Sequence, residues 1–251
     1  MILPSAETHD IPLEEFRAHA HKLADWITRY LEDPARHPVL PPLVPGATRA
    51  LLAPAPPQQG ESLDTILADF ERTILPGLTH WNHPGFMAYF ANSATAPGIL
   101  AEFLMAALNV NGMLWRTSPA ATELEQVVTD WLRQLLGLTP GWFGMVNDLA
   151  STSTLYALAA AREADASLEV RRLGLAGRDI PRMRVYCSEW AHNSIDKAAM
   201  TLGIGAENVV RVKADAEFRM RPELLEAAIA ADRAEGFKPI AVVATVGTTS
   251  M

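Results

Sequence analysis

Hydrophobic positions along the chain follow a helical period in the first part of the sequence and a strand-and-helix alternation in the last part. Up to about residue 163, apolar side chains recur every three or four residues, which is typical of helices that bury one face. From about residue 182, short apolar runs alternate with helical stretches. Helices are predicted over residues 12–32, 62–78, 96–112 and 118–136, with a further helix from residue 150 onwards.

The last part of the chain predicts a parallel sheet. Strands are expected over residues 182–188, 208–214 and 239–246, and helices over 193–203 and 221–236. Alternating strands and helices of these lengths favour parallel strands joined by right-handed crossovers. The predicted fold class is therefore an open α/β sheet, in which ligands bind at the carboxyl ends of the strands.

Residues 1–60 are interpreted as an N-terminal helical arm with a proline-rich connection, and residues 61–251 as the start of a larger α/β domain. Eight of the eighteen prolines lie between residues 33 and 62, and because proline fixes φ and lacks an N–H, this stretch should run extended over a surface. The arm is expected to pack on the larger body or on a partner subunit. Its helix presents one apolar face made of Phe16, Ala20, Leu23, Ile27 and Leu31.

Composition limits the classes of function. A chain of 251 residues can bury a sizeable core, and its net charge of −8 argues against a nucleic-acid partner. No apolar run is long enough to cross a bilayer, and the first residues lack the basic region of a signal peptide, so a soluble, cytoplasmic protein without a membrane partner is expected. A single cysteine, Cys187, excludes an internal disulfide and a cysteine-rich metal site, and no metal is expected.

Three places at the predicted sheet edge are candidates for chemistry. The turn Ala150–Thr154 is rich in small and hydroxyl residues and starts a helix, which suits either a phosphate cradle or an ordinary Ser/Thr cap. His192 follows a strand, where its ring can cover a flat cofactor or be a loop residue without a special role. The last strand delivers a run of small residues to the same edge, comprising Thr245, Gly247, Thr248 and Thr249.

Five segments, in this order, resemble one known family: "THWNHPGFMAYF", "SPAATELE", "ASTSTLYALAAAR", "SEWAHNSIDKAA" and "ATVGTTS". They are similar to segments of the group II decarboxylases that use pyridoxal 5′-phosphate (PLP), the aromatic L-amino acid decarboxylase family. The resemblance runs from about residue 12 to the last residue. It implies the large domain of an aspartate-aminotransferase-like fold (PLP fold type I) in a homodimer, with the arm exchanged between subunits.

The resemblance also implies a cofactor site and a reaction. Ala150 and Ser151 would hold the cofactor phosphate, His192 would stack on the pyridine ring, and Thr245 would line the cofactor pocket. The implied reaction is the decarboxylation of an L-amino acid, of the aromatic class, to the amine and CO₂, with the protonated pyridine acting as an electron sink. One departure from the family is Leu149, which stands where a small hydroxyl residue is usual.

Aromatic residues near position 85 are implied to shape the substrate pocket. The resemblance gives this role to Trp81, Tyr89 and Phe90, whereas reading the residues alone predicts core packing. The aromatic pair is often followed by proline in the family, but Ala91 and Asn92 follow it here.

The family's Schiff-base lysine, in a His-Lys pair, and the aspartate that binds the pyridine nitrogen both lie beyond the position matching Met251. None of the four lysines has the family context, and Lys197 is expected to be a surface or ion-pair residue. The sequence is therefore interpreted as the first half of a longer or two-piece enzyme, with a C-terminal second half as a partner, and as inactive alone. The alternatives are a noncatalytic fragment that binds cofactor or partner, and an aromatic aldehyde synthase of the same family.

Overall fold

The computed structural model describes residues 11–90 and 92–248. The first ten residues of the predicted arm, Ala91 and residues 249–251, including Thr249, lie outside this description. The chain divides into two compact units, Met1–Leu104 and Met105–Met251, and each is described by itself. The predicted boundary near residue 60, between the N-terminal arm and the α/β domain, stays a prediction.

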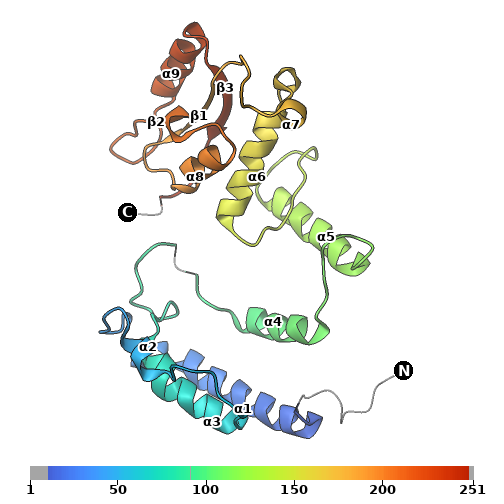
Figure 1. Ribbon diagram of the computed structural model, residues 1–251, viewed down its shortest axis with the longest axis vertical. Coiled ribbons are helices and arrows are strands. Elements are labelled where there is room, and N and C mark those ends of the chain that lie inside the picture. Colours follow the sequence, from blue (N-terminus) through green and yellow to red (C-terminus); the bar gives the residue numbers. More distant parts are fainter. Residues whose placement is uncertain (1–10, 91, 249–251) are drawn as a thin grey trace. The chain divides into compact units, whose positions relative to one another are not determined.

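The first unit is built from helices (Figure 1). Helix α1, Leu13–Glu32, follows Pro12 and has acidic residues in its first turn, where the positive end of the helix dipole favours them. Helix α3, Leu63–Asp69, is capped by Ser62, whose hydroxyl accepts the Thr65 N–H at 3.1 Å. The other elements are a 3₁₀ turn at Pro34–Arg36, α2 at Ala47–Leu51, a π turn at Phe70–Ile74, a 3₁₀ turn at Leu75–Gly77, and α4 at Ala96–Leu108, which continues into the second unit.

Polar contacts join α1 to the segment around α3. The Trp26 indole N–H donates to the Glu71 carboxylate at 2.6 Å, and Lys22 pairs with Asp64 at 2.7 Å. Both pairs cross more than forty residues of sequence, so the proline-rich connection folds back and the helix of the predicted arm lies on the body of its own unit.

The second unit contains the sheet. Strands β1 (Met183–Ser188), β2 (Val209–Val212) and β3 (Lys238–Val243) are parallel and lie in the order β2-β1-β3. Helix α8, Ser194–Thr201, connects β1 to β2, and α9, Pro222–Ala234, connects β2 to β3 (Figure 1). The predicted alternation of strands and helices is confirmed, and all three strands end at one edge.

Alternate residues of β1 face different helices. Met183, Val185 and Cys187 belong to one buried cluster with residues of α8 and of α6, Ala150–Glu163. Tyr186 points the other way, and its hydroxyl donates to the Asp232 carboxylate on α9 at 2.6 Å. The sheet therefore has α6 and α8 on one face and α9 on the other, which is why five of the six residues of its central strand are buried.

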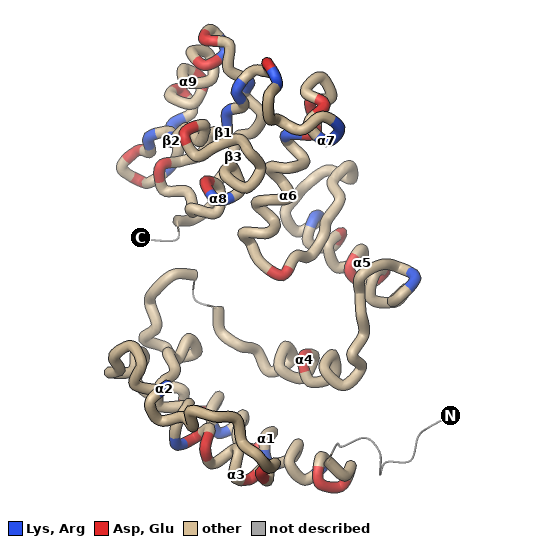
Figure 2. The backbone as a smooth tube through the Cα atoms, viewed as in Figure 1, with Lys and Arg blue, Asp and Glu red and all other residues tan. Residues whose placement is uncertain are grey.

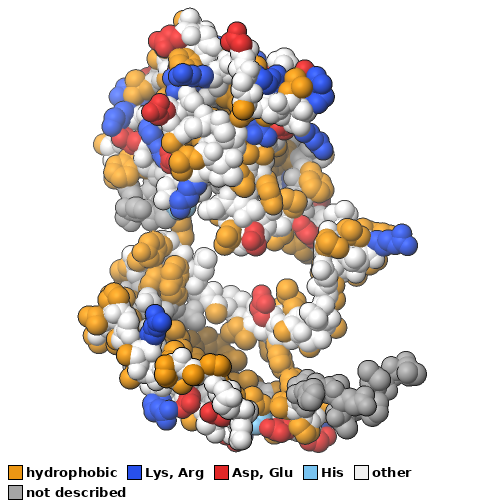
Figure 3. Space-filling view, in the orientation of Figure 1, with side chains coloured by type: hydrophobic (Ala, Val, Ile, Leu, Met, Phe, Trp, Pro, Cys, Tyr) orange, Lys and Arg blue, Asp and Glu red, His pale blue; other side chains and the backbone are white. Residues whose placement is uncertain are grey.

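Helix α5, Pro119–Leu135, exposes its apolar stripe, and no residue of α5 is buried. Figure 3 shows hydrophobic side chains at the surface of both units, while Figure 2 shows acidic and basic residues interspersed over the unit that holds the sheet. Between residues 11 and 248, apart from position 91, no helix combines the length and apolarity needed to cross a membrane. The stripe consists of Leu124, Val127, Val128, Trp131, Leu132 and Leu135, each between 44% and 84% exposed.

Candidate cofactor site

The carboxyl edge of the sheet collects two of the predicted site residues. β1 ends at Ser188, and the loop that follows it carries His192. β3 ends at Val243, and Thr245 lies exposed two residues beyond. Because the two strands are parallel neighbours, both residues follow the same edge.

Helix α6 begins with free backbone donors. Its cap residue Leu149 is extended, with φ −138° and ψ 144°, and makes no side-chain cap bond. Within the described residues, the N–H groups of Ala150, Ser151 and Thr152 have no hydrogen-bond partner. The interpretation of this turn as an ordinary Ser/Thr cap is therefore wrong, and the three amides together with the helix dipole are available to an anion.

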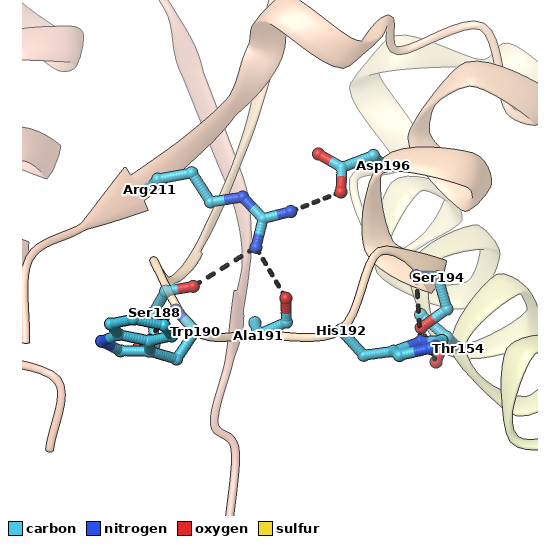
Figure 4. A network of polar contacts seen from close by, with 8 residues as sticks. All are labelled: Thr154, Ser188, Trp190, Ala191, His192, Ser194, Asp196 and Arg211. Atoms are coloured by element: carbon cyan, nitrogen blue, oxygen red, sulfur yellow. Dashed lines mark hydrogen bonds and ion pairs between the residues drawn. The ribbon is translucent and has the colours of Figure 1, made fainter. Parts of the chain in front are cut away.

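The start of α8 lies beside the start of α6. The Thr154 and Ser194 hydroxyl oxygens are 3.5 Å apart, and the Ser194 N–H donates to His192 Nδ1 at 3.2 Å (Figure 4). Since Nδ1 accepts this bond, the neutral imidazole carries its proton on Nε2. His192 is exposed at the edge of this junction. A groove of about 200 Å³ between the two helices is lined by Ser151, Thr152, Leu155, Ser194, Lys197, Ala198 and Thr201.

The β1–α8 loop is held by an arginine that the sequence reading missed. Arg211 on β2 donates from Nη1 to the carbonyls of Ser188 at 3.3 Å and Ala191 at 3.0 Å, and its Nη2 binds the Asp196 carboxylate (Figure 4). A sequence signal was present, because an arginine inside the apolar run "NVVRVKA" needs buried acceptors.

Glu189, the first residue of the same loop, is hydrogen-bonded to the residues that directly follow β2. The Glu189 carboxylate accepts the Ala214 N–H at 2.8 Å and a hydrogen bond from Lys213 Nζ at 2.7 Å. These two bonds, the Lys213 bond first, lower the pKa of Glu189 below its ordinary value. Trp190 meets Phe218 edge to face, with ring centroids 5.6 Å apart. The backbone leading to His192 is therefore fixed from several sides.

The predicted substrate aromatics lie in the first unit. Trp81 stacks on Phe86 at 4.6 Å and on Tyr89 at 5.9 Å, but 44% of its surface is exposed, so it packs against neighbours without entering a core. Tyr89 has φ +58°, a strained conformation for this residue type, and both Tyr89 and Phe90 are exposed. Their contribution to a substrate pocket stays a prediction.

Comparison with known proteins decides the family. Residues 45–251 match the family model of the pyridoxal-dependent decarboxylase conserved domain. The chain belongs to the pyridoxal-dependent decarboxylase family. The expected family is thus confirmed over more than half of the chain.

Several relatives of this decarboxylase-family chain have names or titles that mention aromatic compounds. Tyrosine decarboxylase 4 of Petroselinum crispum is 38% identical over 94% of this chain and 47% of its own length. The crystal structure of Oryza sativa TDC with PLP and tryptamine has a TM-score of 0.85 and 32% identity, covering 96% of this chain and 53% of that one. Rhodiola rosea 4-hydroxyphenylacetaldehyde synthase has a TM-score of 0.85 and 36% identity, covering 95% and 52%. The chain spans about half the length of the curated relatives it matches.

These neighbours confirm the predicted fold class, the α/β large domain of PLP fold type I. The family's cofactor is pyridoxal phosphate, and the residues present fit its phosphate. Three amides without a partner at the start of α6 supply donors for a dianionic group, and the hydroxyls of Ser151 and Ser194 line the adjoining groove. Leu149 lacks the hydroxyl that the family usually has at this position, but these backbone donors remain in place.

Proposed function

We propose that the protein to which this chain belongs is a PLP-dependent decarboxylase that converts an aromatic L-amino acid to its amine and CO₂. The observation that carries the proposal is the junction of α6 and α8, where unpartnered amides lie beside the exposed His192 ring at the carboxyl edge of a parallel sheet. The names of the relatives support the aromatic substrate class.

In this proposal each residue has a separate task. The amides of Ala150 and Ser151 bind the phosphate, and His192 lies over the pyridine ring and fixes its plane. Thr245 lines the pocket from the end of β3, and Trp81, Tyr89 and Phe90 contact the substrate side chain. Bound PLP supplies an electron sink for the charge left when CO₂ departs. His192 is the catalytic residue that this chain contributes.

We further propose that the lysine that binds the cofactor lies outside these 251 residues, so that the chain alone is inactive. Lys22, Lys213 and Lys238 are each engaged in an ion pair with a carboxylate. Lys197 lies exposed on α8 at the rim of the groove that Ser151 lines. Such a lysine would belong to a C-terminal half, in the same polypeptide or a second one.

The exposed apolar stripe of α5 supports a homodimer. A second copy covering this stripe would remove it from water, which favours association. We also propose a cytoplasmic location, because the single cysteine, Cys187, is free and buried and suits a reducing compartment.

Reductive labelling of the intact protein tests the enzyme proposal. PLP is added, the visible spectrum is recorded, the sample is reduced with borohydride, and the labelled peptide is found by mass spectrometry. A label on a lysine outside the present sequence supports the proposal. A label on Lys197 refutes the place given to the lysine, and no label on any lysine leaves the noncatalytic fragment as the function.

The similarity to an aldehyde synthase supports a second candidate, oxidative deamination to the aromatic aldehyde. Product analysis with tyrosine, phenylalanine and tryptophan separates the two reactions. A decarboxylase gives one amine per CO₂, whereas an aldehyde synthase consumes oxygen and water and gives aldehyde, CO₂, ammonia and hydrogen peroxide.

A further inference from the structure

We propose that Arg211 and Asp196 form a positioning pair that holds the β1–α8 loop so that His192 presents its ring face to the cofactor. The inference rests on the proposed function for the role of His192, but the holding of the loop is a property of this chain by itself.

The geometry of Arg211 singles it out. One nitrogen, Nη1, reaches two carbonyls of the same loop, Ser188 at the end of β1 and Ala191 directly before His192. The other, Nη2, binds Asp196 in the first turn of α8. The guanidinium therefore joins β2, the loop and α8, and the closer of its two loop carbonyls belongs to Ala191, the neighbour of the histidine.

Asp196 is the acid that balances Arg211. Cys187 is the register partner of Arg211 on β1, but burial raises the pKa of its thiol, so it stays neutral and supplies no counter-charge. Asp196 sits in the first turn of α8, where a carboxylate also interacts well with the helix dipole. Both side chains are about 30% exposed, so water only partly weakens the pair.

Arginine suits this task better than lysine. Its planar group has five donors in a fixed arrangement, so it can bind two carbonyls and a carboxylate at once, while a lysine ammonium at the end of a flexible stem cannot hold all three in one geometry. The hydrogen bond from the Ser194 N–H to His192 Nδ1 then fixes the ring relative to α8. Loss of Arg211 would leave the Ser188 and Ala191 carbonyls without this donor.

The first test is hydrogen exchange in the intact protein without cofactor. In Arg211→Met the amides of Ala191 and Ser194 should exchange about tenfold faster, because the loop opens more often. Arg211→Lys should lie between this variant and the wild type. The matched control is Arg219→Met, which removes an exposed arginine that pairs with Asp215 and should leave the loop unchanged. Unchanged exchange in Arg211→Met overturns the inference.

The second test asks whether Arg211 acts through His192. PLP dissociation constants and visible spectra are measured for the wild type, Arg211→Met, His192→Ala and the double variant. We expect Arg211→Met to weaken PLP binding about three- to tenfold in the wild type and to have no further effect in His192→Ala, since coupled residues are not additive. Additive effects overturn the inference.

Two outcomes distinguish a failure of the inference from a failure of the proposed function. If His192→Ala binds PLP as tightly as the wild type, the stacking role fails and with it the purpose of the pair, whatever the exchange data show. If His192→Ala weakens binding but Arg211→Met does not, only the positioning pair is refuted. Asp196→Asn replaces Arg211→Met if circular dichroism shows that the latter is unfolded, and it should give the same pattern more weakly.

Discussion

Tyr186 illustrates how single residues hold the sheet that carries the site. Its side chain is fully buried on the α9 face of β1, and burial and the bond to Asp232 both raise the pKa of its hydroxyl above the ordinary value. The phenol therefore stays neutral and acts as a hydrogen-bond donor to a carboxylate. Such bonds contribute more than bonds between neutral groups.

Tyr186→Phe should lower the free energy of unfolding by about 1–3 kcal/mol, because it leaves the Asp232 carboxylate with one donor fewer. Chemical denaturation of the intact protein measures the change. Tyr156→Phe, at an exposed tyrosine of α6, is the control and should change stability by less than about 0.5 kcal/mol. Equal effects of the two substitutions would contradict this account.

At the residue scale, the sequence predicted the positions of the candidate residues whose place in an element is simple. Ala150 and Ser151 start a helix, and His192 and Thr245 follow strands, as expected, while their roles at the cofactor stay predictions. Arg211 was missed because its role depends on which carbonyls lie next to it across two strands. That information comes from the register of β1 and β2.

At the scale of elements, three aromatic residues join α1 to the segments that follow it in the first unit. Tyr30 on α1 makes a 2.9 Å hydrogen bond to His80 Nδ1, and the His80 and His37 rings stack at 4.5 Å. Burial lowers the pKa of both histidines below 6.5, and for His37 the neighbouring His80 adds to the effect. The Leu75 carbonyl acts in the opposite direction on His80 but does not outweigh burial.

The histidine pair makes the first unit sensitive to acid. A depressed pKa in the folded state means that the unfolded state binds protons more tightly, so the contribution to stability is complete above pH 6.5 and is lost as pH falls below it. Between pH 8 and pH 5.5, the protection factors of the α1 amides, which are exchange rates corrected for the intrinsic effect of pH, should fall. His80→Asn should reduce this dependence, while His21→Gln, at an exposed histidine, should preserve it. Protection factors that are equal or higher at pH 5.5 would contradict the assignment.

Secondary structure was predictable to within a few residues wherever one period dominated. The strand expected over residues 239–246 ends at Val243, which forms the last register pair with β1, at Cys187. Helix α2 was not predicted, since it is too short for a periodic signal. The single helix predicted over residues 62–78 is divided in the structure into α3, the π turn at Phe70–Ile74 and the 3₁₀ turn at Leu75–Gly77.

At the scale of the whole molecule, the exposed stripe of α5 predicts the assembly. Leu132→Glu places a charge in the stripe and should convert the proposed dimer to a monomer at micromolar concentration, measured by light scattering after gel filtration. Gln126→Glu adds the same charge on the opposite side of the helix and should leave the dimer intact. A variant that stays dimeric but is destabilised would show that the same polypeptide covers the stripe.

The sequence alone also does not predict which surface covers the apolar stripe of α5. The period of residues 118–135 shows that one side of α5 is apolar, but it does not identify the surface that covers that side. Likewise, the family resemblance assigns Trp81 to a substrate pocket, whereas its contacts here are Phe86 and Tyr89.

The central claim is that the start of α6 binds the cofactor phosphate. Its most direct test compares the affinity of the Ala150→Pro variant for PLP with its affinity for pyridoxal, which lacks the phosphate. Proline is tolerated at the first helical position, and the extended Leu149 before it is compatible with a following proline, so the variant removes one amide donor and little else. The account predicts that the ratio of PLP affinity to pyridoxal affinity falls about tenfold relative to the wild type and to Ala150→Ser, which keeps the N–H. An unchanged ratio in a folded Ala150→Pro protein would contradict it.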